Sequence, residues 1–198
     1  MREDMKSLIG WHAEHCPERI LVRLVTDFGD IVLSLFLKEA PLSSNGFLSE
    51  IDRGTYVGGT FWRIVHPEND CGSPPISVIQ ASVRSEHQPQ VVTHEPTSRT
   101  GLSHRHGTIS LARSEEFGGT SSSFFLCIGD QPGLDEGGGR TNDGQGFAAF
   151  GQIIEGMEVA QEIHAGTTQD IAPHPYLSGQ IRAEPVFIRN AFREPNVS

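Results

Sequence analysis

One arginine stands inside an apolar stretch of this chain. Arg63 lies within residues 61–65, which read Phe-Trp-Arg-Ile-Val. A guanidinium keeps its charge and is costly to bury without partners, so a strand carrying one must point it at a partner or into a cleft. Arg63 is therefore the first candidate for a functional residue, and its chemistry would be the donation of hydrogen bonds.

A second stretch of interest is residues 121–127, Ser-Ser-Ser-Phe-Phe-Leu-Cys. Successive side chains of a strand point to opposite faces of the sheet, so one of Phe124 and Phe125 faces the core and the other faces outward. The outward ring could form an apolar surface for a ligand. The serines lack the Gly-x-Ser-x-Gly pattern of a hydrolase nucleophile, so hydrolysis is not indicated.

Other candidate chemistries are weaker. His94, His104 and His106 lie close together in the sequence, but no carboxylate or cysteine stands at ligand spacing, so we expect solvated surface histidines and no metal site. The glycine run at 137–139 is followed by neither Lys-Ser nor a helix start, so phosphate binding is not supported. The cysteines are odd in number and widely spaced, which predicts reduced thiols: Cys16, Cys71 and Cys127.

Composition narrows the class of protein. The chain has 198 residues, of which 36% are hydrophobic, so one globular domain with a sizeable core is expected. A net charge of -10 would repel nucleic acid and anionic lipid, and the longest apolar run, residues 31–37, is far too short to span a bilayer. No apolar segment follows the charged N-terminus, so we expect a soluble protein, cytoplasmic unless a leader has been removed.

Short runs rich in Val, Ile and Phe predict a mainly β protein. A first helix begins at Pro41 and ends at Gly54, and a second covers residues 156–164. Residues 84–105 are expected to be irregular. The order β-β-α-β-β-β-β-β-α-β favours a closed barrel whose ends are plugged by helices. The expected strands are residues 20–26, 30–37, 61–65, 76–83, 108–112, 123–128, 148–154 and 185–191.

The domain organisation follows from the same pattern. Residues 1–19 carry a loosely helical pattern that ends at Pro17, and we interpret them as an appended arm or helix. Residues 20–198 form the single domain. Within it, residues 66–75 are polar and rich in proline, and residues 133–146 are a glycine-rich surface loop.

Several motifs occur in a familiar order. They are Thr-Asp-Phe-Gly-Asp-Ile-Val at 26–32, Phe-Trp-Arg-Ile-Val at 61–65, Gly-Thr-Ile-Ser-Leu-Ala-Arg at 107–113, Ser-Phe-Phe-Leu-Cys at 123–127, Gly-Leu-Asp at 133–135 and Phe-Gly-Gln-Ile at 150–153. Over residues 20–191 the chain resembles the cyclophilins, peptidyl-prolyl cis-trans isomerases, as a divergent, bacterial-like member. The resemblance implies an eight-stranded antiparallel β-barrel capped by two α-helices.

The resemblance also implies a reaction. Rotation about an X-Pro bond must cross about 18–20 kcal/mol, because resonance gives the C–N bond double-bond character. A donor that bonds the proline nitrogen only once it becomes pyramidal would break that resonance. The family analogy gives this role to Arg63 and requires neither a cofactor nor a metal.

By the same resemblance, a proline pocket lies beside Arg63. Phe125, Leu134 and Val78 would hold the ring, while Gln80 would orient Arg63 or the substrate carbonyl. The backbone around Arg113 would pair with an extended peptide, and the small side chain of Ala112 would let that peptide approach. The substrate-binding residues are thus Val78, Gln80, Ala112, Arg113, Ser123, Phe125, Leu134 and Phe147.

The sequence departs from the family pattern beside this site. Residues 66–75 are an insertion between Arg63 and Gln80. Ser77 replaces the pocket phenylalanine, and Gly133 stands where many members have a tryptophan that favours cyclosporin. These changes imply a thin apolar half of the pocket and weak cyclosporin affinity.

Two functions remain open at this point. The first is an isomerase that binds X-Pro segments and assists protein folding, with proline-containing peptides and unfolded or partly folded proteins as partners, acting as a monomer. The alternative is a cyclophilin-like binding module with weak or no turnover, because the insertion and Ser77 have remodelled the site.

Overall fold

The structure is a computed structural model that describes residues 19–84, 90–114, 118–170 and 174–195. Residues 1–18 of the predicted N-terminal arm, with Cys16 and Pro17, lie outside the described residues, and Arg19, which was assigned to the arm, is the first residue of strand β1. None of the described helices is long and apolar enough to cross a membrane.

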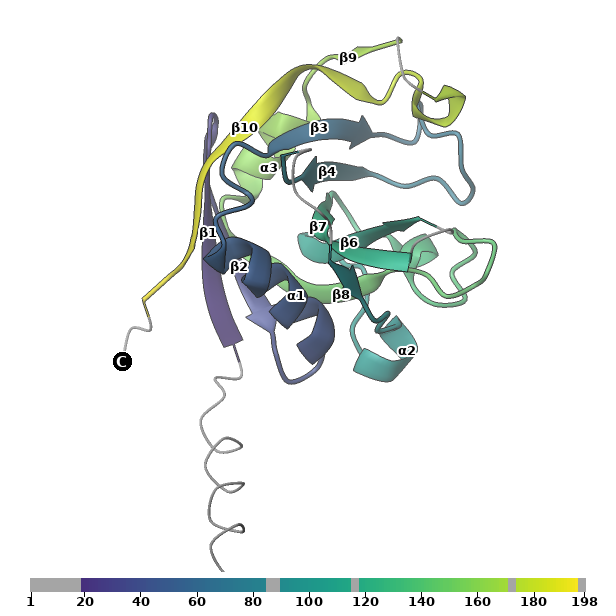
Figure 1. The fold of residues 1–198 in the computed structure, drawn as a ribbon. Helices are drawn as coiled ribbons and strands as arrows, with labels where there is room; N and C mark the ends of the chain where they lie inside the picture. The colour runs from purple at the N-terminus through teal and green to yellow at the C-terminus, as the bar shows by residue number, and fades with distance from the viewer. Residues whose placement is uncertain (1–18, 85–89, 115–117, 171–173, 196–198) are drawn as a thin grey trace, which may run out of the picture.

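Eight of the described strands form a closed antiparallel barrel (Figure 1). Their order around it is β1-β2-β8-β6-β7-β4-β3-β10, and β10 pairs with β1 to close the ring. Closure removes the exposed sheet edges that would otherwise invite aggregation. The strands are β1 (Arg19–Thr26), β2 (Gly29–Phe36), β3 (Thr60–Val65), β4 (Val78–Ser82), β6 (Thr108–Ser114), β7 (Gly118–Cys127), β8 (Ala148–Glu155) and β10 (Ile181–Arg193).

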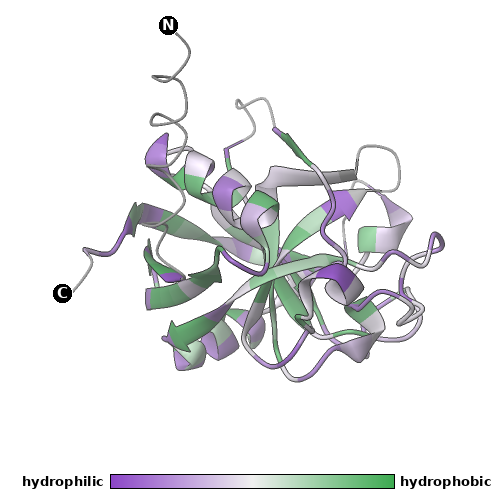
Figure 2. Cartoon of the chain, turned by 90° about the horizontal axis from the view of Figure 1, so that it is seen from below, coloured by the Kyte–Doolittle hydropathy of each residue, from purple (hydrophilic) through white to green (hydrophobic). Residues whose placement is uncertain are grey.

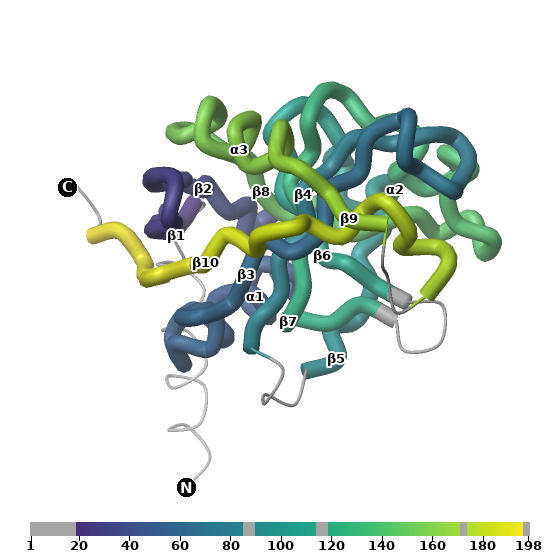
Figure 3. The backbone as a smooth tube through the Cα atoms, turned by 90° about the horizontal axis from the view of Figure 1, so that it is seen from above, coloured from purple at the N-terminus to yellow at the C-terminus, as the bar shows by residue number. Residues whose placement is uncertain are grey.

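Two helices cover the barrel, as the sequence predicts. Helix α1 (Pro41–Asp52) begins with a proline in its first turn and buries Phe47 among barrel side chains. Helix α3 (Met157–His164) buries Val159 and Ile163 in the same core. They lie on opposite sides of the barrel, with the strands between them (Figures 1 and 3). The predicted mainly β fold, a closed barrel capped by two helices, is confirmed.

Apolar side chains pack in two groups, on the two faces of the barrel wall. The large group fills the interior, where Phe124 is fully buried and meets the rings of Phe47, Tyr56 and Phe61 at centroid distances of 5.4–5.8 Å. Figure 2 shows the hydrophobic residues along the strands that surround it. The small group includes Phe125 and lies on the opposite face, as strand alternation requires.

The segment expected to be irregular contains short elements. Residues 91–92 form β5, which pairs with β7, and Thr97–Thr100 form the single turn α2. The prediction of an irregular stretch was therefore wrong there, because one turn of helix and a two-residue strand leave no periodicity to read. The remaining short elements are η1 (Pro132–Leu134), β9 (Thr168–Gln169) and η2 (Pro175–Leu177).

This segment also completes helix α1. The residue before the helix, Ala40, offers no side-chain cap. Glu95 supplies it instead, because its buried carboxylate accepts bonds from the Ser43 N–H and hydroxyl, both at 2.7 Å, and from the Leu42 N–H at 3.2 Å. A negative group at a helix N-terminus satisfies free N–H groups and interacts favourably with the positive end of the helix dipole.

We expect Glu95→Ala to lower the free energy of unfolding by about 2–3 kcal/mol, since it leaves buried donors without a charged acceptor. Urea denaturation measures the change. Glu162→Ala, on the exposed face of α3, is the matched control and should alter stability by no more than about 0.5 kcal/mol. Equal losses in the two variants would contradict the capping role.

Candidate active site

A pocket of about 150 Å³ opens on the outer face of the barrel wall. Eight of the nine site residues expected from the sequence line it, and sequence reasoning missed three others. The expected residues in the lining are Arg63, Val78, Gln80, Ala112, Arg113, Phe125, Leu134 and Phe147, and the missed ones are Ile76, Arg140 and Tyr176.

Strand register explains how Arg63 reaches this face. Phe61 points into the interior, and by simple alternation Arg63 would do the same. The pairing of β3 with β4 shifts between these two residues, so Trp62 is an extra residue in the strand. Such a bulge re-aims the side chains that follow it. Arg63 therefore faces outward, opposite Gln80, which in turn stands opposite Phe125.

The Arg63 guanidinium is held by two amide oxygens. Nε and Nη2 donate to Oε1 of Gln180 at 2.9 and 2.6 Å, and Nη1 donates to Oε1 of Gln80 at 3.0 Å. Burial lowers the pKa of Arg63, but an arginine keeps its proton in a protein. Among the described residues no carboxylate forms an ion pair with it. The charge is oriented without being neutralised.

Ser123 stands apart from the predicted set, because it does not line the pocket. Its Oγ accepts bonds from Gln80 Nε2 at 3.1 Å and from Ser82 Oγ at 3.0 Å, and donates to the Ala81 carbonyl. Ser82 Oγ in turn accepts from the Trp62 indole. With both lone pairs and its proton engaged, Ser123 positions Gln80, and the prediction of direct substrate contact is not supported by its placement.

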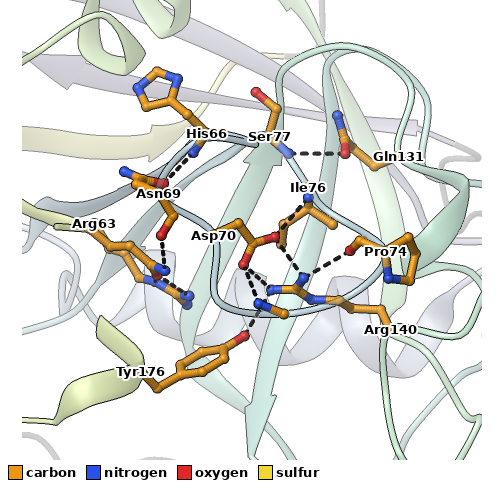
Figure 4. Close-up of polar contacts among 12 residues, drawn as sticks. Arg63, His66, Asn69, Asp70, Pro74, Ile76, Ser77, Gln131, Arg140 and Tyr176 are labelled. Carbon is orange, nitrogen blue, oxygen red and sulfur yellow. Dashed lines mark hydrogen bonds and ion pairs between the residues drawn. The ribbon is translucent and has the colours of Figure 1, made fainter. Parts of the chain in front are cut away.

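The insertion before β4 is fastened by a buried ion pair (Figure 4). Both oxygens of Asp70 accept bonds from Arg140 at 2.7 Å, and the two side chains are 0% and 4% exposed. Arg140 also donates to the Pro74 carbonyl and to the Tyr176 hydroxyl, at 2.9 and 2.8 Å. One guanidinium therefore joins the insertion, the glycine-rich loop and the turn before β10.

Tyr176 gives the pocket an aromatic wall. Its ring lies 5.5 Å from Arg63 Cζ in a cation–π arrangement while its hydroxyl holds Arg140. Ser77 does not face the pocket: its N–H bonds Gln131, and its hydroxyl lies 3.1 Å from His164 Nε2. Ile76 lines the pocket in its place. The expectation of a thin apolar half was therefore wrong, because Ile76 and Tyr176 replace the missing ring.

Gly133 is required by the same insertion. A Cβ built at this position would lie 2.5 Å from Cγ of Pro74, so the space beside it is already occupied. The insertion thus fills the place in which the resemblance puts a tryptophan.

Two of the residues that sequence reasoning missed had a signal in the sequence. Tyr176 is an aromatic residue in a polar turn, and Ile76 is an apolar residue beside the motif, whereas nothing in the sequence marked Gln180.

His104 corrects another expectation. It is 1% exposed, with Nδ1 2.6 Å from Asp135 Oδ1 and Nε2 3.0 Å from Ser110 Oγ. Its ring stacks behind Phe125, with centroids 5.9 Å apart. It is a buried support of the pocket floor and not a solvated histidine. Among the described residues no group of three or more His, Cys, Asp or Glu side chains could hold a metal ion.

Comparison with known proteins adds to this geometry. The sequence profile of the family described as cyclophilin type peptidyl-prolyl cis-trans isomerase/CLD matches residues 21–185. The chain belongs to this family. Peptidyl-prolyl cis-trans isomerase A of Dickeya dadantii is 31% identical over 173 residues, covering 86% of this chain and 82% of the relative.

Solved cyclophilins share the fold. A cyclophilin type peptidyl-prolyl cis-trans isomerase of Cryptosporidium parvum superposes with a TM-score of 0.67 at 17% identity, covering 90% of this chain and 99% of that one. Its structure in the presence of the dipeptide Ala-Pro gives a TM-score of 0.64 at 18% identity, with 89% and 99% covered. The family match and the 31% identical relative make the chain a cyclophilin-type peptidyl-prolyl cis-trans isomerase, and the alternative of a binding module with weak or no turnover is not favoured.

The Asp70–Arg140 pair predicts a pH dependence of stability. Burial alone would raise the pKa of Asp70, but bonds from Arg140 and from the Gly72 and Ile76 N–H groups lower it below its ordinary 3.8. A carboxylate whose pKa is depressed by folding stabilises the protein above its unfolded pKa and loses that effect in acid. Asp70→Asn should cost about 3–5 kcal/mol at neutral pH, because it leaves a buried arginine without its negatively charged partner.

Urea unfolding of Asp70→Asn and wild type across the acid range tests this. The difference in unfolding free energy should hold above pH 3.8 and shrink as the pH falls below it. The control is Asp52→Asn, which removes an exposed ion pair with Arg193 and should cost less than about 1 kcal/mol. A difference for Asp70 that stays constant through acid pH would show that its charge contributes nothing.

Proposed function

We propose that this cyclophilin isomerises X-Pro bonds in extended segments of unfolded or partly folded proteins, with Arg63 as the group that stabilises the transition state. The observation that supports this proposal is the charge and the hydrogen bonding of the Arg63 guanidinium. It is positively charged, fixed at three of its nitrogens by neutral amide oxygens, and it lines an apolar pocket.

Its hydrogen-bond count leaves donors for a substrate. A guanidinium has five N–H groups, and the bonds to Gln80 and Gln180 use three of them. One hydrogen on each terminal nitrogen is left. A donor aimed at the proline nitrogen gains strength only when that nitrogen becomes pyramidal and its lone pair is localised, which lowers the barrier and not the ground state.

The pocket wall suits a proline ring beside that donor. Phe125 meets Phe147 edge to face at a centroid distance of 5.3 Å, and Val78 and Leu134 complete the apolar surface. Both phenylalanines, with the aliphatic side chains, would contact the ring without offering it a hydrogen bond. The apolar half holds the proline while Arg63 acts on its nitrogen.

An extended substrate has a backbone edge to pair with. The pairing of β6 with β8 ends at Leu111, which stands opposite Ala148. Beyond it, Ala112 is paired with no described residue of either neighbouring strand, β7 or β8. A peptide laid along this edge could form main-chain bonds in the manner of an added strand. This edge supports extended chains as substrates.

We expect Arg63→Ala to reduce isomerisation of an X-Pro tetrapeptide by about 10²–10³-fold, the usual loss when a transition-state donor is removed. Exchange NMR measures the rate, and urea unfolding checks that the fold survives. Arg105→Ala removes an arginine that is 70% exposed and should leave the rate at the wild-type value.

Two outcomes would count against the proposal. Wild-type protein that shifts peptide peaks without speeding cis-trans exchange would be a binding module. Folded Arg63→Ala with undiminished activity would place the catalytic donor elsewhere.

A further inference from the structure

A second, larger hollow adjoins the proline pocket. It measures about 550 Å³ and shares four lining residues with the first: Arg113, Arg140, Phe147 and Tyr176. The rest of its lining comes from the insertion and the glycine-rich loop: Gly72, Ser73, Gly139, Thr141 and Asn142. An extended chain advances only about 3.3 Å per residue, so a peptide with its proline in the first pocket places a near neighbour in the second.

The lining carries arginines although the protein has a net charge of -10, and each of them is paired with a carboxylate that lies outside the lining. Two guanidinium groups contribute to it, and none of the described lining residues is acidic. The two arginines differ in availability. All four N–H groups on the terminal nitrogens of Arg140 are used, in bonds to Asp70, Pro74 and Tyr176.

Arg113 is not saturated. Among the described residues, only its Nη2 has hydrogen-bond partners, the two oxygens of Asp143 at 2.5 and 2.7 Å. Its side chain is 10% exposed, and its Nε is the one buried side-chain nitrogen or oxygen among the described residues that has no hydrogen-bond partner. A buried donor left unpaired costs free energy, so the hydrogen bonding of the Arg113 guanidinium is incomplete.

We propose that the hollow is a specificity subsite in which Arg113 binds the carboxylate of an acidic substrate residue near the proline. The inference rests on the proposed function, because it needs the proline in the first pocket. A carboxylate matches the planar, multiple-donor geometry of a guanidinium better than a neutral amide does. The Phe147 ring, 5.9 Å from Arg113 Cζ, and the Tyr176 ring would cover the methylene groups of a glutamate.

Asp143 sets the strength of the subsite. Its side chain is 43% exposed and occupies one edge of Arg113, so it competes with an incoming carboxylate. Removing its charge would leave more of the guanidinium for the substrate. The arrangement makes opposite predictions for changes at Arg113 and at Asp143.

The test compares peptides that differ only in Glu or the isosteric Gln, placed directly before the proline, directly after it, or one position further. At one of these positions the wild type should favour Glu by about tenfold in isomerisation rate by exchange NMR and in affinity by peak-shift titration. The preference should fall as salt is added, because an ion pair at a partly open site is screened.

Two variants decide the assignment. In Arg113→Gln the Glu-to-Gln ratio should fall to about one, and in Asp143→Asn it should rise above that of the wild type. Ratios near one at all three positions in the wild type would overturn the subsite, as would a Glu preference that survives Arg113→Gln. If neither peptide is isomerised, the proposed function fails, and the affinity ratio still decides the subsite.

Discussion

The site depends on keeping one buried charge oriented but not neutralised. A carboxylate beside Arg63 would hold the guanidinium well and compete for the same N–H groups that a substrate needs. Amide oxygens of Gln80 and Gln180 fix the same plane while leaving the formal charge whole. Ser123 and Ser82, which are hydrogen-bonded to each other behind Gln80, then serve to set which way the Gln80 amide faces.

The orientation of Gln180 extends this constraint into the insertion. Its Nε2 donates to the Asn69 carbonyl at 2.8 Å, and Asn69 bonds the carbonyls of Ile64 and Gly179. The insertion is thus tied to β3 and to the turn before β10, the two elements that carry Arg63 and its partner. The residues that lengthen the β3–β4 connection are thus held in place, and Ile76 at their end forms part of the pocket wall.

The sequence allowed the barrel and most of the site to be predicted, for identifiable reasons. Alternation separates Phe124 from Phe125, and short motifs place Arg63, Gln80 and Leu134 in one family pattern. The bulge at Trp62 was invisible, because an extra residue in a strand leaves alternation looking intact on either side. Gln180 and Tyr176 lie more than a hundred residues from Arg63, and only the closed barrel brings them back to it. The burial of His104 depends in the same way on Asp135 and Ser110.

Three arginines meet at this surface, and their hydrogen-bond partners separate their roles. Arg140 bonds a carboxylate, a carbonyl and a hydroxyl through its terminal nitrogens, so its main role is to hold the scaffold together. Arg63 has two neutral oxygens and spare donors, so it can act on a substrate. Arg113 has one exposed carboxylate and an unpaired buried Nε, so it can still exchange partners. Because like charges repel, the charge of Arg140 disfavours the charge of Arg63, and the buried carboxylate of Asp70, which pairs with Arg140, acts in the opposite direction. Asp70 therefore helps Arg63 to stay charged without an ion pair of its own.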